Sequence, residues 1–240
     1  MMIEKRLFIL RIFSMLHHEN KNVFYEENML VLEELFRSQK AMSSSHFNLR
    51  FQRGLSWLKK STDLDECPEF KFMSLWIAFR AIHVAEGEEP SALTRIFLQE
   101  IYHSDQNGRI ATLLWGKLQQ SILSLLHSPY LYTEFWQYQH QEINQHTWQN
   151  HFIAEKYQIE NAVQQHHSME ILARIFQGLH VLHEQISLGG MSYQSAIYQK
   201  YIQESGQILS RFLPVFMYIL LENITHFEVE KPFYPTISMC

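Results

Sequence analysis

Apolar residues recur every three or four positions along most of this chain, which is the spacing that predicts amphipathic α-helices. Residues 24–40 carry one such stripe, with charged side chains on the opposite face. Residues 70–84 are apolar almost throughout and exceed the length of an ordinary strand, so they predict a buried central helix. No convincing pair of strands interrupts this pattern. The sequence therefore predicts an all-α fold with at least about 60% helix.

Turn-forming residues divide the helical pattern. The Ser-rich stretch 41–46 predicts a loop between an N-terminal helical arm, residues 1–45, and a helical domain, residues 46–240, with one continuous core from about residue 47. Four later helices are expected at residues 109–127, 144–165, 168–186 and 193–224, the last bent near Ser205-Gly206 and again near Pro214. The segment 104–109 partly resembles a calcium loop. His103 and Leu114, however, stand at the first and last ligand positions, where such a loop needs carboxylates, so the segment predicts a plain turn.

Composition narrows the class of protein. The formal net charge of −5 shows no overall basic character that would favour nucleic acid. Two cysteines, Cys67 and Cys240, make no disulfide framework and suit a reducing compartment, so we expect a cytoplasmic protein. The longest apolar run is ten residues, 212–221, and the N-terminal run 5–16 is split by Arg11 without a cleavage site, so we expect no membrane span.

Histidines are the most conspicuous candidates for chemistry. Fourteen are present, and clusters occur at 17/18, 140/146/151, 166/167 and 180/183. His180, His183 and Glu184 share one helix face at a spacing that suits a metal, but a zinc site needs further ligands that the sequence does not identify. A solvated or aromatic-packed histidine surface is the alternative. Nucleotide, hydrolase and redox motifs are absent, so we expect neither a small-molecule cofactor nor a bound metal.

Several segments together resemble bacterial proteins of the HEPN family. They are "KFMSLWIAFRAIH", "GRIATLLWGKL", "FWQYQHQ", "ILARIFQGLHVLHEQISLGGMSYQSAIYQKYIQESGQIL" and "FLPVFMYILLENI", within residues 47–236. The resemblance implies a HEPN-like bundle of four or five core helices, here with the extra N-terminal arm, and a homodimer. We expect residues 171–188 or the helix from 195 near the dimer interface, and we expect exposed aromatic side chains at Trp136, Tyr138 and Trp148.

The same resemblance implies a catalytic signature that this chain has lost. Many HEPN proteins are metal-independent ribonucleases with an Arg, an adjacent polar residue and a His before a glycine, because Arg stabilises phosphoryl charge and His transfers protons near neutral pH. Aligned on Gly189-Gly190, the Arg position holds His183, the polar position Glu184 and the His position Leu188. Arg174 and His180 keep a matching spacing, but six helical positions place them about 120° apart.

These observations predict a catalytically degenerate HEPN-like dimer that acts as a binding module, in contact with RNA or a partner protein, in an RNA-linked defence or toxin–antitoxin setting. One alternative is an active ribonuclease with a remodelled site that uses His180, His183 and Glu184. The other alternative is a metal-binding helical protein built on the histidine clusters. Under the first interpretation, His183 is a half-exposed helix residue whose replacement is mild.

Overall fold

The computed structural model describes residues 21–83 and 90–227. The helices are, in chain order, α2 (Lys21–Gln39), α3 (Ser45–Thr62), α4 (Pro68–His83), α5 (Pro90–Ser104), α6 (Arg109–Trp115), α7 (Gln119–Leu126), the 3-10 helix η1 (Pro129–Leu131), α8 (Thr133–Gln139), α9 (Gln145–Gln164), α10 (Ser168–Ser187), α11 (Gln199–Glu222) and α12 (Ile224–Phe227). Helices hold 79% of the described residues, which contain no strand. The prediction of an all-α fold is confirmed.

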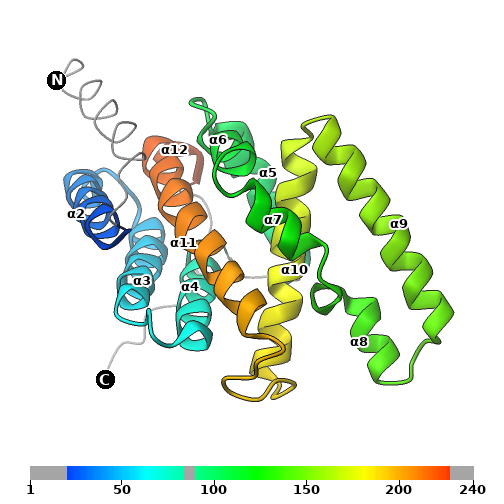
Figure 1. Ribbon diagram of the computed structural model, residues 1–240. Helices are drawn as coiled ribbons and strands as arrows, with labels where there is room; N and C mark the ends of the chain where they lie inside the picture. Colours follow the sequence, from blue (N-terminus) through cyan, green and yellow to red (C-terminus); the bar gives the residue numbers. More distant parts are fainter. Residues whose placement is uncertain (1–20, 84–89, 228–240) are drawn as a thin grey trace.

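The middle of the molecule is formed by α4 and α11, with α2 and α3 on one side and α10 and α9 on the other (Figure 1). The predicted central helix is confirmed as α4, whose apolar side chains are covered by α3, α11 and α10. Aromatic rings join these helices at the centre of the core. The Phe79 ring of α4 lies 4.6 Å from that of Phe176 on α10, which in turn lies 5.5 Å from Phe216 on α11.

The core begins earlier than the sequence indicated. Met29, Leu32 and Phe36 of α2 are buried in the same core as the later helices, and the Phe36 ring stacks on Phe51 at 4.6 Å. The expectation of a core starting near residue 47 is therefore wrong. The division of the chain at residue 45 stays a prediction, and residues 1–20 of the arm lie outside the described part of the chain.

Two predicted helix boundaries differ from the structure. The helix expected over 109–127 is divided into α6 and α7 at Gly116, where a Cβ atom would lie 2.5 Å from the Thr112 carbonyl oxygen. The helix expected from 193 begins at Gln199, because the preceding connection is held to α4 by a hydrogen bond from the Gln194 amide to the buried Glu69 carboxylate. From Gln199, α11 continues through Ser205-Gly206 and Pro214 as one helix.

The three aromatic side chains expected at the surface are largely covered. Trp136 is only 9% exposed, and its indole donates a hydrogen bond to the Tyr130 carbonyl at 2.9 Å. Tyr138 and Trp148 are half-buried, with their rings stacked 6.0 Å apart where α8 packs against α9. The expectation of exposure is wrong because Trp136 packs beside Tyr198, and the rings of Tyr138 and Trp148 join α8 to α9. None of the described helices combines the length and the apolar character needed to cross a bilayer.

Candidate functional site

The Gly-Gly sequence that sets the register of the resemblance ends α10 as a helix cap. Gly189 has φ of +76°, a left-handed conformation that favours glycine. Its amide donates to the Ile186 carbonyl at 3.2 Å, and the Gly190 amide donates to the Gln185 carbonyl at 2.8 Å. This pair of hydrogen bonds is the Schellman arrangement, which satisfies carbonyls at a helix end. Leu188, at the expected catalytic His position, is 82% exposed beside this cap.

His183 lies against an indole ring instead of an open site. Its imidazole stacks on Trp76 of α4 at 5.4 Å, and its Nε2 lies 3.1 Å from the Ser187 hydroxyl. Burial, together with the nearby His180 and Arg80, lowers the pKa of His183 to about 4. The imidazole is therefore neutral at pH 7 and is a weak base, poorly matched to proton transfer near neutral pH.

His180 and Glu184 complete this end of α10. The His180 ring also stacks on Trp76, at 6.0 Å, and its Nε2 lies 3.5 Å from the Glu184 carboxylate. Both imidazoles therefore stack on the Trp76 indole, as in the aromatic-packed histidine surface that is the alternative to a metal site. Glu184 is exposed at the position of the polar residue in the signature, where its negative charge opposes the approach of a phosphodiester.

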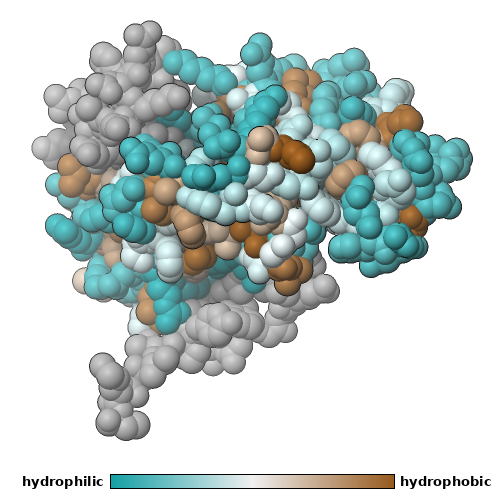
Figure 2. Space-filling view, turned by 60° about the horizontal axis from the view of Figure 1, so that its bottom comes forward, coloured by the Kyte–Doolittle hydropathy of each residue, from teal (hydrophilic) through white to brown (hydrophobic). Residues whose placement is uncertain are grey.

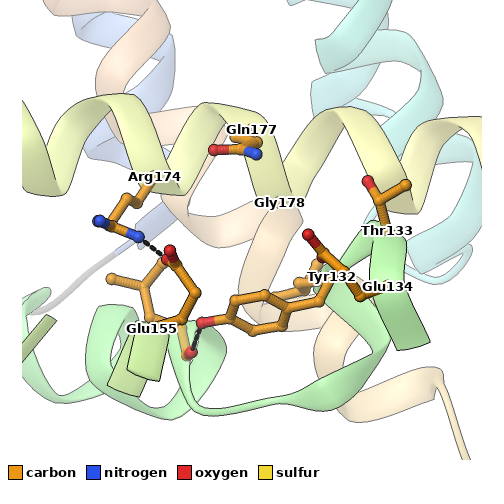
Figure 3. A pocket seen from close by; sticks show the side chains of 9 residues that line it. Tyr132, Thr133, Glu134, Glu155, Arg174, Gln177 and Gly178 are labelled. Atoms are coloured by element: carbon orange, nitrogen blue, oxygen red, sulfur yellow. Dashed lines mark hydrogen bonds and ion pairs between the residues drawn. The ribbon is translucent and has the colours of Figure 1, made fainter. Parts of the chain in front are cut away.

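Arg174 points toward Glu155 of α9 (Figure 3). Its guanidinium forms ion pairs with Glu155 and with Glu170, the latter at 3.4 Å, and donates to the Gln158 side chain at 2.7 Å. Burial lowers the pKa of Arg174 from its ordinary value. The positive charge of Arg174 is therefore already opposed by two carboxylates within the protein.

A small cavity of about 60 Å³ adjoins this ion pair, between the η1–α8 segment, α9 and α10 (Figure 3). It is lined by two carboxylates, Glu134 and Glu155, and by the single guanidinium of Arg174. The Tyr132 hydroxyl donates to the Leu126 carbonyl at 2.6 Å, and burial raises the pKa of this phenol to about 12. The cavity therefore carries an excess of negative charge, which disfavours phosphate.

A larger groove, of about 980 Å³, lies between α5 and α10. Its apolar lining includes Leu98, Met169 and Phe176, and its charged lining consists of Arg95, Arg174, Glu155 and Glu170. His180 and Arg174 both line this groove, yet they have different partners: His180 stacks on the Trp76 ring, and Arg174 pairs with the two glutamates of the lining. The structure therefore does not pair the two alternative catalytic candidates.

The most strongly perturbed histidine is one that the sequence did not single out. His83 is 1% exposed at the end of α4, with Nδ1 2.8 Å from the Phe79 carbonyl and Nε2 3.0 Å from the Thr94 hydroxyl. A carbonyl only accepts, so Nδ1 carries the proton and Nε2 accepts from Thr94. Burial lowers the pKa of His83 to about 3. The sequence signal for a buried histidine was the position of His83 within the apolar run 70–84.

The remaining histidine clusters do not converge on a metal-like site. Across residues 21–83 and 90–227, no group of three or more His, Cys, Asp or Glu side chains is arranged to hold an ion. Individual histidines instead lie near single carboxylates, as in the pairs His140–Glu142, His151–Glu134 and His167–Glu170. The predicted 17/18 cluster lies outside the described residues.

Comparisons with known proteins add no further identification. No family model, no curated protein and no solved structure matches this chain.

Proposed function

We propose that this protein is a non-catalytic helical interaction module, working in the cytoplasm, that contacts a partner protein and does not cleave RNA. The observation that carries this proposal is the internal neutralisation of Arg174 by Glu155 and Glu170. A guanidinium that is already paired does not stabilise charge developing on a phosphate. The resemblance to HEPN ribonucleases makes RNA cleavage the activity to test.

The state of His183 supports the same proposal. Its pKa of about 4 leaves the imidazole neutral at pH 7, stacked on the core residue Trp76. The other signature positions hold Glu184, which is negatively charged, and Leu188, which is apolar. None of these three side chains supplies the positive charge that cleavage of a phosphodiester needs.

The groove between α5 and α10 supports a protein partner. Its two arginines and two glutamates cancel in formal charge, so it lacks the positive excess that a nucleic-acid backbone requires. From Ser168 to His180 the groove follows about 18 Å of α10. An apolar floor of this length suits an amphipathic helix laid along it.

The direct test is to incubate the purified protein with labelled single-stranded RNA and excess chelator. We expect no cleavage by wild type, by His183→Ala or by Arg174→Ala, and no saturable RNA binding. Cleavage by wild type that is lost in His183→Ala, with the fold intact, would establish the remodelled ribonuclease instead. Saturable binding without cleavage would make RNA the partner.

A second experiment addresses the groove. Selection from a displayed library of amphipathic helical peptides should yield binders, and Gln177→Trp in the groove should weaken them at least about tenfold. Leu188→Glu, at the exposed end of α10 and outside the groove, is the control and should leave binding unchanged. Binders that are insensitive to Gln177→Trp would place the contact surface elsewhere.

A further inference from the structure

The groove between α5 and α10 runs along two antiparallel helices. At one end, Thr94 and Arg95 of α5 lie beside His180 of α10. Thr94 contacts His83 at 3.0 Å, and the pKa of His83 is lowered by burial and, more weakly, by nearby charges that include His180. At the other end, Tyr102 of α5 lies near the start of α10. The lining of the groove can therefore be followed from one end to the other.

The two ends of the groove carry opposite charge. Arg95, which is exposed, supplies a positive charge at the His180 end. Near the start of α10, Glu155 and Glu170 outnumber Arg174, which leaves one negative charge in excess. The dipoles of the antiparallel helices α5 and α10 oppose each other, so they do not offset this difference. From Glu170 to His180, α10 rises about 15 Å, which exceeds the screening distance of about 8–10 Å at physiological salt.

The centre of the groove is apolar. Met169, Ala173 and Phe176 follow one another at three or four positions along α10, and Leu98 of α5 lies beside them. The helix α9 adds Glu155 to the lining, so a further helix laid along this stripe can contact three helices of the protein. Figure 2 shows hydrophobic residues scattered among hydrophilic ones over one face, so exposed apolar side chains alone do not mark a docking position. The charged ends of the groove supply that distinction.

We propose that the groove binds an amphipathic helix that presents an acidic residue to Arg95 at one end and a basic residue to Glu155 and Glu170 at the other. This inference rests on the proposed function, which identifies the groove as the contact surface. The side chain of Glu170 is 41% exposed and can receive the basic residue. Because the charged ends are about 15 Å apart, the two partner residues lie about three turns apart on one face of the partner helix.

Charge complementarity favours this occupant over uniformly charged ones. A phosphate backbone carries negative charge along its whole length and would meet Glu155 and Glu170 at one end. A uniformly basic helix would likewise meet Arg95 at the opposite end. Charges of the same sign that face each other across an interface select against such partners.

Selection from the displayed library of helical peptides tests this pattern when the residues at both ends of the apolar face are randomised. Binders selected on wild type should combine one acidic and one basic end at least about fivefold more often than the starting library does, as two surface charge pairs allow. Arg95→Glu should instead select basic residues at both ends. Lys40→Glu, at the exposed end of α2 on the other side of the molecule (Figure 1), makes the same change of charge and should select the wild-type pattern.

Fluorescence anisotropy with one selected peptide measures the pairing directly. Replacing its acidic residue by lysine should weaken binding to wild type about fivefold and should strengthen binding to Arg95→Glu by a similar factor. A higher salt concentration should reduce both differences, because the pairs are exposed to solvent.

The results distinguish the charge pattern from the proposed function. Binders that are sensitive to Gln177→Trp but show no charge pattern would overturn the pattern and leave the groove as the contact surface. A library that yields no binders would overturn both. If Lys40→Glu changes the selected charges as strongly as Arg95→Glu does, the net charge of the protein governs the selection, and the proposed pairing is wrong.

Discussion

Arg174 of α10 and Glu155 of α9 form an ion pair that joins two neighbouring helices, with 18% and 34% of their side chains exposed. Glu170, one turn before Arg174 on α10, provides a second carboxylate at 3.4 Å. The guanidinium therefore balances charge on both helices. This gives Arg174 a structural role that the spacing of Arg174 and His180 in the sequence did not indicate.

Replacing Arg174 tests that role. Arg174→Leu leaves Glu155 and Glu170 close together without a counter-charge, and should lower the free energy of unfolding by about 1–2 kcal/mol in urea denaturation. The double variant Arg174→Leu/Glu155→Leu removes one of the unpaired charges and should recover part of this loss. An unchanged free energy in the single variant would show that the pair contributes nothing to stability.

The buried His83 predicts a loss of stability in acid. Its pKa falls from an ordinary value of 6.5 to about 3 on folding, so between these values the unfolded chain binds a proton that the folded chain does not. The contribution of His83 is fully present above pH 6.5 and decreases as the pH falls, by up to about 1.4 kcal/mol per pH unit. The depressed pKa of His183 acts in the same direction.

His83→Leu separates this effect from the titration of carboxylates. The variant should be less stable at pH 7, by about 1–3 kcal/mol, since the Phe79 carbonyl and the Thr94 hydroxyl lose their partner. Its free energy of unfolding should nevertheless depend less steeply on pH between 6.5 and 4 than that of wild type. Urea titrations across this range measure both quantities, and parallel pH profiles would refute the assignment.

His183 and Trp76 should differ sharply in their cost of replacement. His183→Ala removes a half-buried ring and one hydrogen bond to Ser187, and should change the free energy of unfolding by no more than about 1 kcal/mol. Trp76→Ala opens a cavity beneath His183 and should lower the free energy of unfolding by about 3–5 kcal/mol, because the indole is 1% exposed. Chemical denaturation compares the two, and a larger loss for His183→Ala would show a structural role for the imidazole.

Stability should depend on glycine at position 189, because the backbone there is left-handed. Gly189→Ala places a side chain at φ of +76° and should destabilise the protein by about 1 kcal/mol, seen as a lower melting temperature. Asparagine tolerates the left-handed region better, so Gly189→Asn should cost less. Equal melting temperatures for Gly189→Ala and wild type would indicate that the cap contributes little.

Local patterns predicted the helices well because their signals lie within a few residues of each other. The apolar run 70–84 identified α4, and the stripe in residues 168–186 identified α10. The division at Gly116 was missed because it depends on the close approach of one backbone atom, the Thr112 carbonyl oxygen, rather than on apolar periodicity. Likewise, the start of α11 depends on a hydrogen bond between residues 125 positions apart, Glu69 and Gln194.

The candidate site shows the same limit. The placement of His180, His183 and Glu184 on one helix face followed from their spacing, and the separation of His180 from Arg174 followed from helical geometry. The sequence did not reveal that the Trp76 ring covers both imidazoles, or that α9 provides two partners of Arg174, the side chains of Glu155 and Gln158. Such contacts join separate helices and become visible only once the helices are packed.

The shallow attachment of α9 implies that the molecule opens in a definite order. Of its 20 residues, Ile159 and Ala162 are the buried ones, and the remaining support comes from the rings of Trp148 and Phe152, which pack against aromatic rings of the preceding segment, and from charged and polar contacts at Arg174. Amide hydrogens of α9 should therefore exchange with solvent through small local openings, well before those of α4 and α11. Added salt should accelerate exchange in α9, because salt screens the charged contacts at Arg174. The apolar contacts of α4 and α11 are not screened, so their amides should stay protected.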